Sequence, residues 1–194
     1  MKSQFLESRK KTAKELVMAL KKHYSYVSIL GTDVRCQSIV ASSRSASISD
    51  EGLGSECGFV LKMKNNKGFF EYALDDIKGD IQKLANEIVA KLSINESLMA
   101  KMIDTADILD EPMEKSFVRE SDFDKYSVND LMDYTDELKN EVMARSENVA
   151  NVSVSIGTLD VSKIFITEHK MLDQGYTWVN GNIRMIWKEN DRLT

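Results

Sequence analysis

The sequence is poor in residues that cross-link a chain, bind metals or break secondary structure. Its 194 residues include one proline, two cysteines and two histidines. The single proline, Pro112, argues against a long disordered linker, and no apolar run approaches the roughly 20 residues needed to span a bilayer. The N-terminal residues lead into a polar helix rather than an apolar signal core. We therefore expect a cytoplasmic protein whose Cys36 and Cys57 stay reduced.

Clustered positive charge is also missing. The chain has 26 basic and 31 acidic residues and a net charge of −5 at pH 7. Proteins that bind nucleic acids usually present a basic face that displaces counterions from the phosphates. The densest basic runs, residues 9–11 and 21–22, fall on one predicted helix. Direct binding of nucleic acid is therefore not expected.

What the chain does contain is typical of a globular domain. Hydrophobic residues make up 42% and charged residues 29% of the sequence, which is the balance of a folded protein rather than a disordered one. The length suits one domain, or two small units that share a core.

Helical periodicity recurs along the sequence. Apolar residues spaced by three and four predict helices over residues 3–23, 77–92 and 128–145. Asp75 or Asp76 is expected to cap the second helix, and Ser127 with Asp130 resembles a capping box before the third. A further helix is expected around residues 96–109, with Pro112 ending it.

Alternating apolar and polar residues predict strands between these helices. The first group is expected at 26–29, 34–49, 57–63 and 69–72, with turns at 31–33, 50–54 and 64–68. The second group is expected at 152–156, 162–167 and 176–188, with a break at 180–182.

The order of helix followed by strands occurs twice. It predicts two related halves, residues 1–92 and 127–194, connected by 93–126. Strands joined by short turns favour antiparallel pairing. The predicted fold is therefore α+β, with an antiparallel or mixed sheet and helices packed on one face.

The sequence predicts no metal or thiol site. Zinc needs three or four converging ligands, and neither His23 nor His169 has a second histidine at helical spacing. Cys36 and Cys57 fall on alternating strand patterns, so each is expected to be a small buried apolar residue. No base can be paired with either thiol from the sequence, which argues against nucleophilic catalysis.

Two loop motifs fail on spacing. The glycines of residues 52–58 lack the spacing of a dinucleotide fingerprint, and a strand rather than a helix follows them. Residues 122–133 begin like a calcium loop, but Ser127 stands where glycine is needed and Asp133 where glutamate is needed. A G-x-S-x-G elbow is also missing.

Aromatic residues gather near the C-terminus at Tyr176, Trp178 and Trp187. Such residues are enriched on binding surfaces. On alternating strands, however, aromatic side chains more often belong to the core, so burial is the favoured interpretation.

Two stretches of the chain resemble a known family. The first runs from Ser42-Ser43-Arg44-Ser45 through Glu56-Cys57-Gly58-Phe59 to Gly68-Phe69-Phe70-Glu71-Tyr72. The second runs from Asp124-Lys125-Tyr126-Ser127 through Asn151-Val152-Ser153-Val154 and Lys163-Ile164-Phe165 to Gly175-Tyr176-Thr177. Their order resembles the N-terminal domain of the TldD/PmbA family, also called modulators of DNA gyrase. Where that family often has a Ser-Asp-Gly turn, this chain has Thr167-Glu168-His169.

The resemblance implies a function for the chain. Complete family members are metal-dependent peptidases, often dimeric, whose His-Glu-x-x-x-His helix lies in a following domain and is expected to hold a metal, namely zinc. No such motif occurs here, so residues 1–194 are expected to be the non-catalytic domain, with no catalytic, cofactor or metal residue and no peptidase activity of their own. Its expected roles are shaping the peptide channel and subunit assembly, with a homo- or hetero-dimer partner and a peptide substrate.

Two other functions remain open. The chain is alternatively a stand-alone protein- or peptide-binding scaffold without any link to proteolysis. A weaker alternative is regulation of a DNA enzyme through protein contact. The Ser-rich alternating strands favour a polar sheet face, and an edge that can receive an extended peptide.

Overall fold

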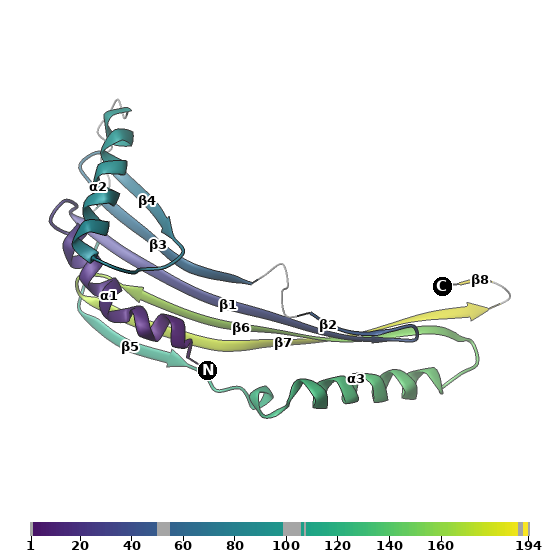
Figure 1. The fold of residues 1–194 in the computed structure, drawn as a ribbon. Coiled ribbons are helices and arrows are strands. Elements are labelled where there is room, and N and C mark those ends of the chain that lie inside the picture. Colours follow the sequence, from purple (N-terminus) through teal and green to yellow (C-terminus); the bar gives the residue numbers. More distant parts are fainter. Residues whose placement is uncertain (1, 50–54, 99–105, 107, 190–191, 194) are drawn as a thin grey trace. The chain divides into compact units, whose positions relative to one another are not determined.

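The computed structural model describes residues 2–49, 55–98, 106, 108–189 and 192–193. Within these residues the chain forms three α-helices, one 3-10 helix and eight strands (Figure 1). They are, in chain order, α1 (Gln4–Leu20), β1 (Tyr26–Ser42), β2 (Ala46–Ser49), β3 (Glu56–Asn65), β4 (Gly68–Leu74), α2 (Ile81–Leu98), β5 (Met113–Val118), the 3-10 helix η1 (Asp122–Lys125), α3 (Val128–Met143), β6 (Val149–Ile166), β7 (Lys170–Glu189) and β8 (Arg192–Leu193). None of the described helices has the length and apolar character needed to cross a membrane.

The strands form a mixed sheet. Their order is β4-β3-β1-β6-β7-β5, with β2 beside β1 and β8 beside β7. β3 and β4 pair antiparallel, whereas β5 runs parallel to β7. The predicted α+β fold with an antiparallel or mixed sheet is therefore confirmed in its mixed form.

The chain divides into two compact units. Unit 1 comprises residues 1–33, 56–118 and 162–175, and unit 2 comprises residues 34–55, 119–161 and 176–194. Strands β1, β6 and β7 contribute residues to both units. The halves predicted from the sequence are continuous segments of the chain, whereas each compact unit combines separate segments. The division into two related halves therefore remains a prediction.

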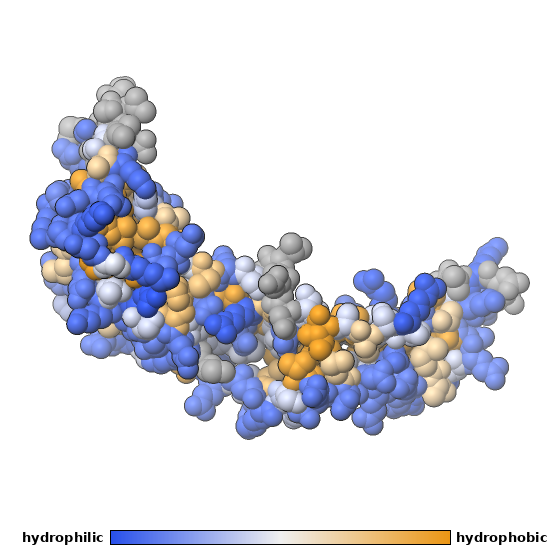
Figure 2. All heavy atoms as spheres, viewed as in Figure 1, coloured by the Kyte–Doolittle hydropathy of each residue, from blue (hydrophilic) through white to orange (hydrophobic). Residues whose placement is uncertain are grey.

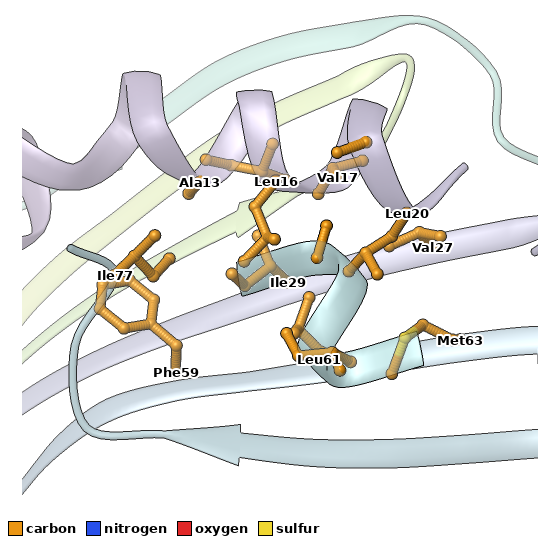
Figure 3. Packing of buried hydrophobic residues seen from close by; sticks show 14 of the residues in the cluster. Ala13, Leu16, Val17, Leu20, Val27, Ile29, Phe59, Leu61, Met63 and Ile77 are labelled. Atoms are coloured by element: carbon orange, nitrogen blue, oxygen red, sulfur yellow. The ribbon is translucent and has the colours of Figure 1, made fainter. Parts of the chain in front are cut away.

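Unit 1 is built around an apolar cluster between two helices and the sheet. Ser3 caps α1, because its hydroxyl accepts a hydrogen bond from the Leu6 amide at 3.1 Å. Helix α1 then presents Leu16, Val17 and Leu20 to the sheet (Figure 3). These residues pack with members of α2, β1, β3, β4 and β6, so both helices cover the same apolar core.

Helix α2 begins later than predicted. It starts at Ile81, where Asp80 accepts hydrogen bonds from the amides of Gln82 and Lys83. The expected caps Asp75 and Asp76 lie in the connection before it, and so does Ile77. Ile77 is buried in the core cluster. Its apolar spacing to Ile81 therefore reflects burial of the connection, not a helical turn.

The predicted turn at residues 31–33 is wrong, because β1 is continuous from Tyr26 to Ser42. A Cβ on Gly31 would stand 2.7 Å from the Phe59 ring and 2.8 Å from the Ile164 side chain. Glycine is needed there because Phe59 and Ile164 pack against the strand. Gly31 is thus required by tertiary packing. In the sequence alone, a glycine required by packing looks the same as a glycine required by a turn.

The strands after α3 also differ from the prediction. Three strands were expected, but β6 and β7 are two long strands, and β7 is not broken at residues 180–182. Strand β5 was missed, since residues 113–118 were assigned to a connection. The predicted turn at 50–54 and most of the predicted helix at 96–109 lie outside the described residues, while residues 96–98 belong to α2.

Other local predictions are confirmed. The hairpin at residues 64–68 joins β3 to β4, and Gly68 adopts a φ of 136° that favours glycine. Ser127 and Asp130 form the capping box at the start of α3. Each uses its side chain to satisfy the other residue's backbone amide.

Unit 2 has smaller cores than unit 1. One cluster joins Leu131 of α3 to Ile39 and Ile156 of the sheet. A second joins Leu138 and Val142 of α3 to the buried valines of β6. Figure 1 shows α3 running alongside these strands. Unit 2 therefore consists of strands covered by one amphipathic helix.

Candidate functional site

The histidines are not brought into a site. His23 is exposed in the turn after α1, with its amide bonded to the Leu20 carbonyl at 2.9 Å. His169 lies in the turn between β6 and β7, with Nε2 3.7 Å from Glu168. Among the described residues, no three His, Cys, Asp or Glu side chains converge as metal ligands do. The described residues therefore do not fit a zinc centre.

The cysteines lie in different units. Cys36 of β1 is half-buried in unit 2, and Cys57 of β3 is exposed in unit 1. Neither forms a disulfide. The prediction that both are buried apolar residues is wrong for Cys57, because strand alternation does not reveal which face of a strand the rest of the protein covers.

The acidic stretch before α3 is a local turn. Residues 122–125 form the 3-10 helix η1, and Lys125 Nζ lies 2.5 Å from the Asp122 carboxylate. Both side chains are exposed. The Asp122 carboxylate is thus paired with a lysine of the same short helix.

The structure instead forms a hollow in unit 2 of about 470 Å³. Three neighbouring strands, β1, β6 and β7, supply its walls. Most of its side chains are small or polar, and none of the described residues that line it is charged. We call it the three-strand hollow; its residues are Cys36, Gln37, Ser38, Ser155, Gly157, Thr158, Leu159, Trp178, Val179 and Asn180.

One glycine of the three-strand hollow makes room for the side chain of Asn180. A Cβ on Gly157 would collide with the Asn180 side chain. The three heavy atoms nearest to that Cβ would all belong to Asn180. The absence of a side chain at Gly157 thus lets Asn180 lie across β6. Sequence reasoning missed Gly157 and Asn180, because their juxtaposition depends on the register of β6 against β7.

Trp178 stands at the rim of the three-strand hollow. Its side chain is 65% exposed, so the prediction that it belongs to the core is wrong. Tyr176 is half-buried and meets Trp178 edge to face, with ring centroids 6.0 Å apart. Trp187 differs from Trp178, since it is half-buried against the valine cluster of β6.

A second hollow of about 280 Å³ lies between α3 and β7 in the same unit. It is more apolar, and Phe123, Tyr134, Leu138 and Ile183 line it together with residues 154–156 and 179–182. Tyr134 is 56% exposed and Ile183 is 51% exposed. Figure 2 shows apolar groups at the surface alongside α3, bordered by hydrophilic ones. We call this second hollow, between α3 and β7, the helix-side hollow.

The strongly shifted carboxylates lie away from both hollows, in unit 1. Arg9 hydrogen bonds hold the pKa of Asp76 far below its usual value, although burial opposes the shift. Burial raises the pKa of Asp173, but hydrogen bonds from Lys10, Lys2 and Ser116 outweigh it and set that pKa at about 2. These groups anchor α1, so they indicate structural ion pairs rather than acid–base chemistry.

The same arrangement of strands and helices occurs in known proteins. A candidate modulator of DNA gyrase from Bacteroides thetaiotaomicron matches with a TM-score of 0.70 and 12% identity, over 94% of this chain and 42% of that chain. TldE from Thermococcus kodakarensis matches with a TM-score of 0.67 and 12% identity, over 94% of this chain and 41% of that chain. A candidate modulator of a DNA gyrase from Thermotoga maritima matches with a TM-score of 0.64 and 18% identity, over 93% of this chain and 40% of that chain.

The chain has the fold found in TldD/PmbA-family proteins. The resemblance inferred from its sequence is thereby confirmed at the level of the fold. Neither the protein-family models nor the curated proteins compared with the chain give a match. The chain spans about two fifths of the length of each TldD/PmbA-like structure above.

Proposed function

We propose that this chain is a non-catalytic peptide-binding and assembly domain of a TldD/PmbA-like metallopeptidase system in the cytoplasm. The observation that carries the proposal is the three-strand hollow, an uncharged depression rimmed by Trp178. The likeness of the fold to TldE and to the candidate gyrase modulators supports the same proposal.

The chemistry of the hollow suits an extended peptide of little sequence preference. Hydroxyl and amide side chains from all three strands can exchange hydrogen bonds with a peptide backbone. A volume of about 470 Å³ lies within the roughly 300–1,000 Å³ typical of ligand sites. None of the described residues that line the hollow is charged, so we expect no strong preference for acidic or basic peptides.

Trp178 is the expected anchor for such a peptide. Its ring is exposed and contacts Tyr176 at one edge, and we expect this contact to reduce the side-chain freedom that is lost on binding. Large aromatic side chains of this kind dominate the affinity of many interfaces. Such a wall would suit a peptide channel, since a single aromatic contact retains peptides without fixing their sequence.

Binding of a labelled, unstructured, uncharged peptide tests this function by fluorescence polarisation. We expect saturable binding that Trp178→Ala weakens about tenfold or more. Tyr134→Ala is the matched control, because it removes another exposed aromatic side chain of unit 2 from the helix-side hollow. That variant should bind like the unchanged chain.

The same samples test the absence of catalysis. The purified chain should leave the peptide intact over the whole incubation. Cleavage that a chelator inhibits would overturn the non-catalytic role. A chain that binds no peptide, or one whose binding ignores Trp178→Ala, would overturn the role of the three-strand hollow.

A further inference from the structure

Asn180 presents an exposed carboxamide in the three-strand hollow. It lies on β7 two positions after Trp178, so the two side chains share one face of the strand. No group in the described part of the chain hydrogen-bonds to the Asn180 side chain. The carboxamide therefore keeps an acceptor oxygen and two N–H donors for a ligand.

Gly157 leaves the space that this carboxamide occupies. A Cβ on Gly157 would lie 2.4 Å from the Asn180 side-chain oxygen and 3.3 Å from its Cγ. Contacts as short as 2.4 Å essentially never occur for a real Cβ, so any other residue at position 157 would displace the carboxamide. The end of the Asn180 side chain thus lies against the backbone of β6, where glycine alone allows it.

The backbone of β6 does not itself require this glycine. Gly157 is not among the described glycines with positive φ. Glycine inside a strand lowers stability relative to a residue with a side chain that packs. In return, the Asn180 side chain gives the described part of the chain no hydrogen bond. A ligand of Asn180 therefore explains this pair of residues better than the stability of the fold does.

Small residues border the carboxamide. Ser38 of β1 and Ser155 of β6 line the three-strand hollow together with Gly157. Serine and glycine project little above a sheet, so they leave room for the main chain of a ligand to approach Asn180 within hydrogen-bonding distance.

We propose that Asn180 recognises the main chain of a bound peptide, by pairing its carboxamide with the N–H and the C=O of one peptide residue. The N–H and C=O of a residue in an extended strand point to the same edge, as the paired bonds of an antiparallel ladder require. A carboxamide offers the matching acceptor and donor side by side. The inference rests on the proposed function and names its substrate class, which is extended peptides with a free main-chain N–H.

Trp178 and Asn180 suit the same extended peptide. Residues two positions apart on a strand are separated by roughly 7 Å, and an extended peptide repeats with the same spacing. A peptide that follows β7 can thus place one side chain on Trp178 and, two residues along, its N–H and C=O on Asn180. Neither contact depends on a particular peptide sequence.

Fluorescence polarisation with two matched peptides tests the inference. The first is a labelled peptide of alternating alanine and serine, and the second is the same peptide with every main-chain nitrogen methylated. Asn180→Ala should weaken binding of the first peptide about tenfold, through the loss of its paired hydrogen bonds. The methylated peptide has no N–H for the carboxamide oxygen, so Asn180→Ala should change its affinity much less. Equal losses for both peptides, or no loss for the first, would overturn the inference.

Asn182→Ala is the matched control. Asn182 is exposed on the same strand and lines the helix-side hollow but not the three-strand hollow. This variant should bind both peptides as the unchanged chain does. A loss as large as that of Asn180→Ala would place the peptide in the helix-side hollow and overturn the inference.

Gly157→Ala tests the positioning role of Gly157. The heavy atoms nearest to the new Cβ all belong to the Asn180 side chain, so that side chain should move while the strands stay in place. We expect the same loss of affinity as in Asn180→Ala, and no further loss when the two changes are combined. Additive losses would show that Gly157 does not act through Asn180.

The two proposals can fail separately. Peptide binding that Trp178→Ala weakens and Asn180→Ala does not would remove only the recognition of the main chain. A chain that binds neither peptide would remove the peptide-binding role, and this inference with it.

Discussion

The ring of Tyr176 meets the ring of Trp178 edge to face, with the planes at 90° and the centroids 6.0 Å apart. The two residues are separated by two positions on β7, so their side chains lie on the same face of the strand. The contact restrains an otherwise exposed indole beside the three-strand hollow.

Removal of this restraint should free Trp178. In a Trp187→Phe background, in which Trp178 alone reports, Tyr176→Ala should lower the fluorescence anisotropy of the indole. Tyr176→Phe keeps the ring contact and should leave the anisotropy unchanged. An anisotropy insensitive to Tyr176→Ala would mean that other contacts restrain the indole.

The ion pair between Arg9 and Asp76 should stabilise unit 1 through its geometry. Arg9 donates from Nε to Asp76 Oδ1 at 2.7 Å and from a terminal nitrogen to Oδ2 at 3.2 Å. Lysine cannot reproduce this paired contact. Arg9→Lys and Asp76→Asn should therefore each lower the urea midpoint, and together less than additively.

A matched control for that pair is the exposed contact between Lys125 and Asp122. Exposed pairs of this kind contribute little to stability. Lys125→Met should therefore leave the urea midpoint nearly unchanged. Equal losses from Arg9→Lys and Lys125→Met would show that the paired geometry has no special value.

The stability of the chain should fall in acid partly through Asp173. Its folded pKa is about 2, below the ordinary value of 3.8. A carboxylate with a lowered folded pKa stabilises the protein fully above its unfolded pKa, and this stabilisation is lost as the pH falls through the folded pKa. The loss should amount to about 2 kcal/mol between about pH 4 and pH 2.

Urea unfolding at several pH values measures this effect. Asp173→Asn should be less stable at neutral pH, since Lys2 and Lys10 lose their partner. The variant should also show a shallower decline between about pH 4 and pH 2. A decline as steep as that of the unchanged chain would assign the acid sensitivity to other carboxylates.

The cap of α3 should be worth a measurable share of stability. The Ser127 hydroxyl accepts from the Asp130 amide at 3.2 Å and completes the capping box. Ser127→Ala should cost about 1 kcal/mol in the free energy of unfolding. Ser93→Ala is the control, because Ser93 is an exposed residue inside α2 and alanine favours helix. Equal free energies of unfolding for Ser127→Ala and Ser93→Ala would show that the cap does not stabilise the protein.

The sequence predicts those parts of the fold that local signals specify. The capping box at Ser127 and the hairpin before Gly68 are contiguous in sequence, and both are confirmed. Gly31 gave a false turn, because its cause is the distant pair Phe59 and Ile164. Strand β5 was missed because its partner is residues 170–175 of β7, far along the chain.

The candidate site was harder to predict for the same reason. Trp178 was recognised as a candidate, but alternation along a strand does not show whether a face is covered. Gly157 and Asn180 come together only through the register of two strands.

Hydrogen exchange of backbone amides, with and without an unstructured peptide, tests the central claim most directly. The account predicts slower exchange at residues 36–38, 155–159 and 178–180, which line the three-strand hollow, and unchanged exchange on the edge strand β4. Protection confined to β4, or no protection anywhere, would contradict the claim that this domain binds peptides in the three-strand hollow.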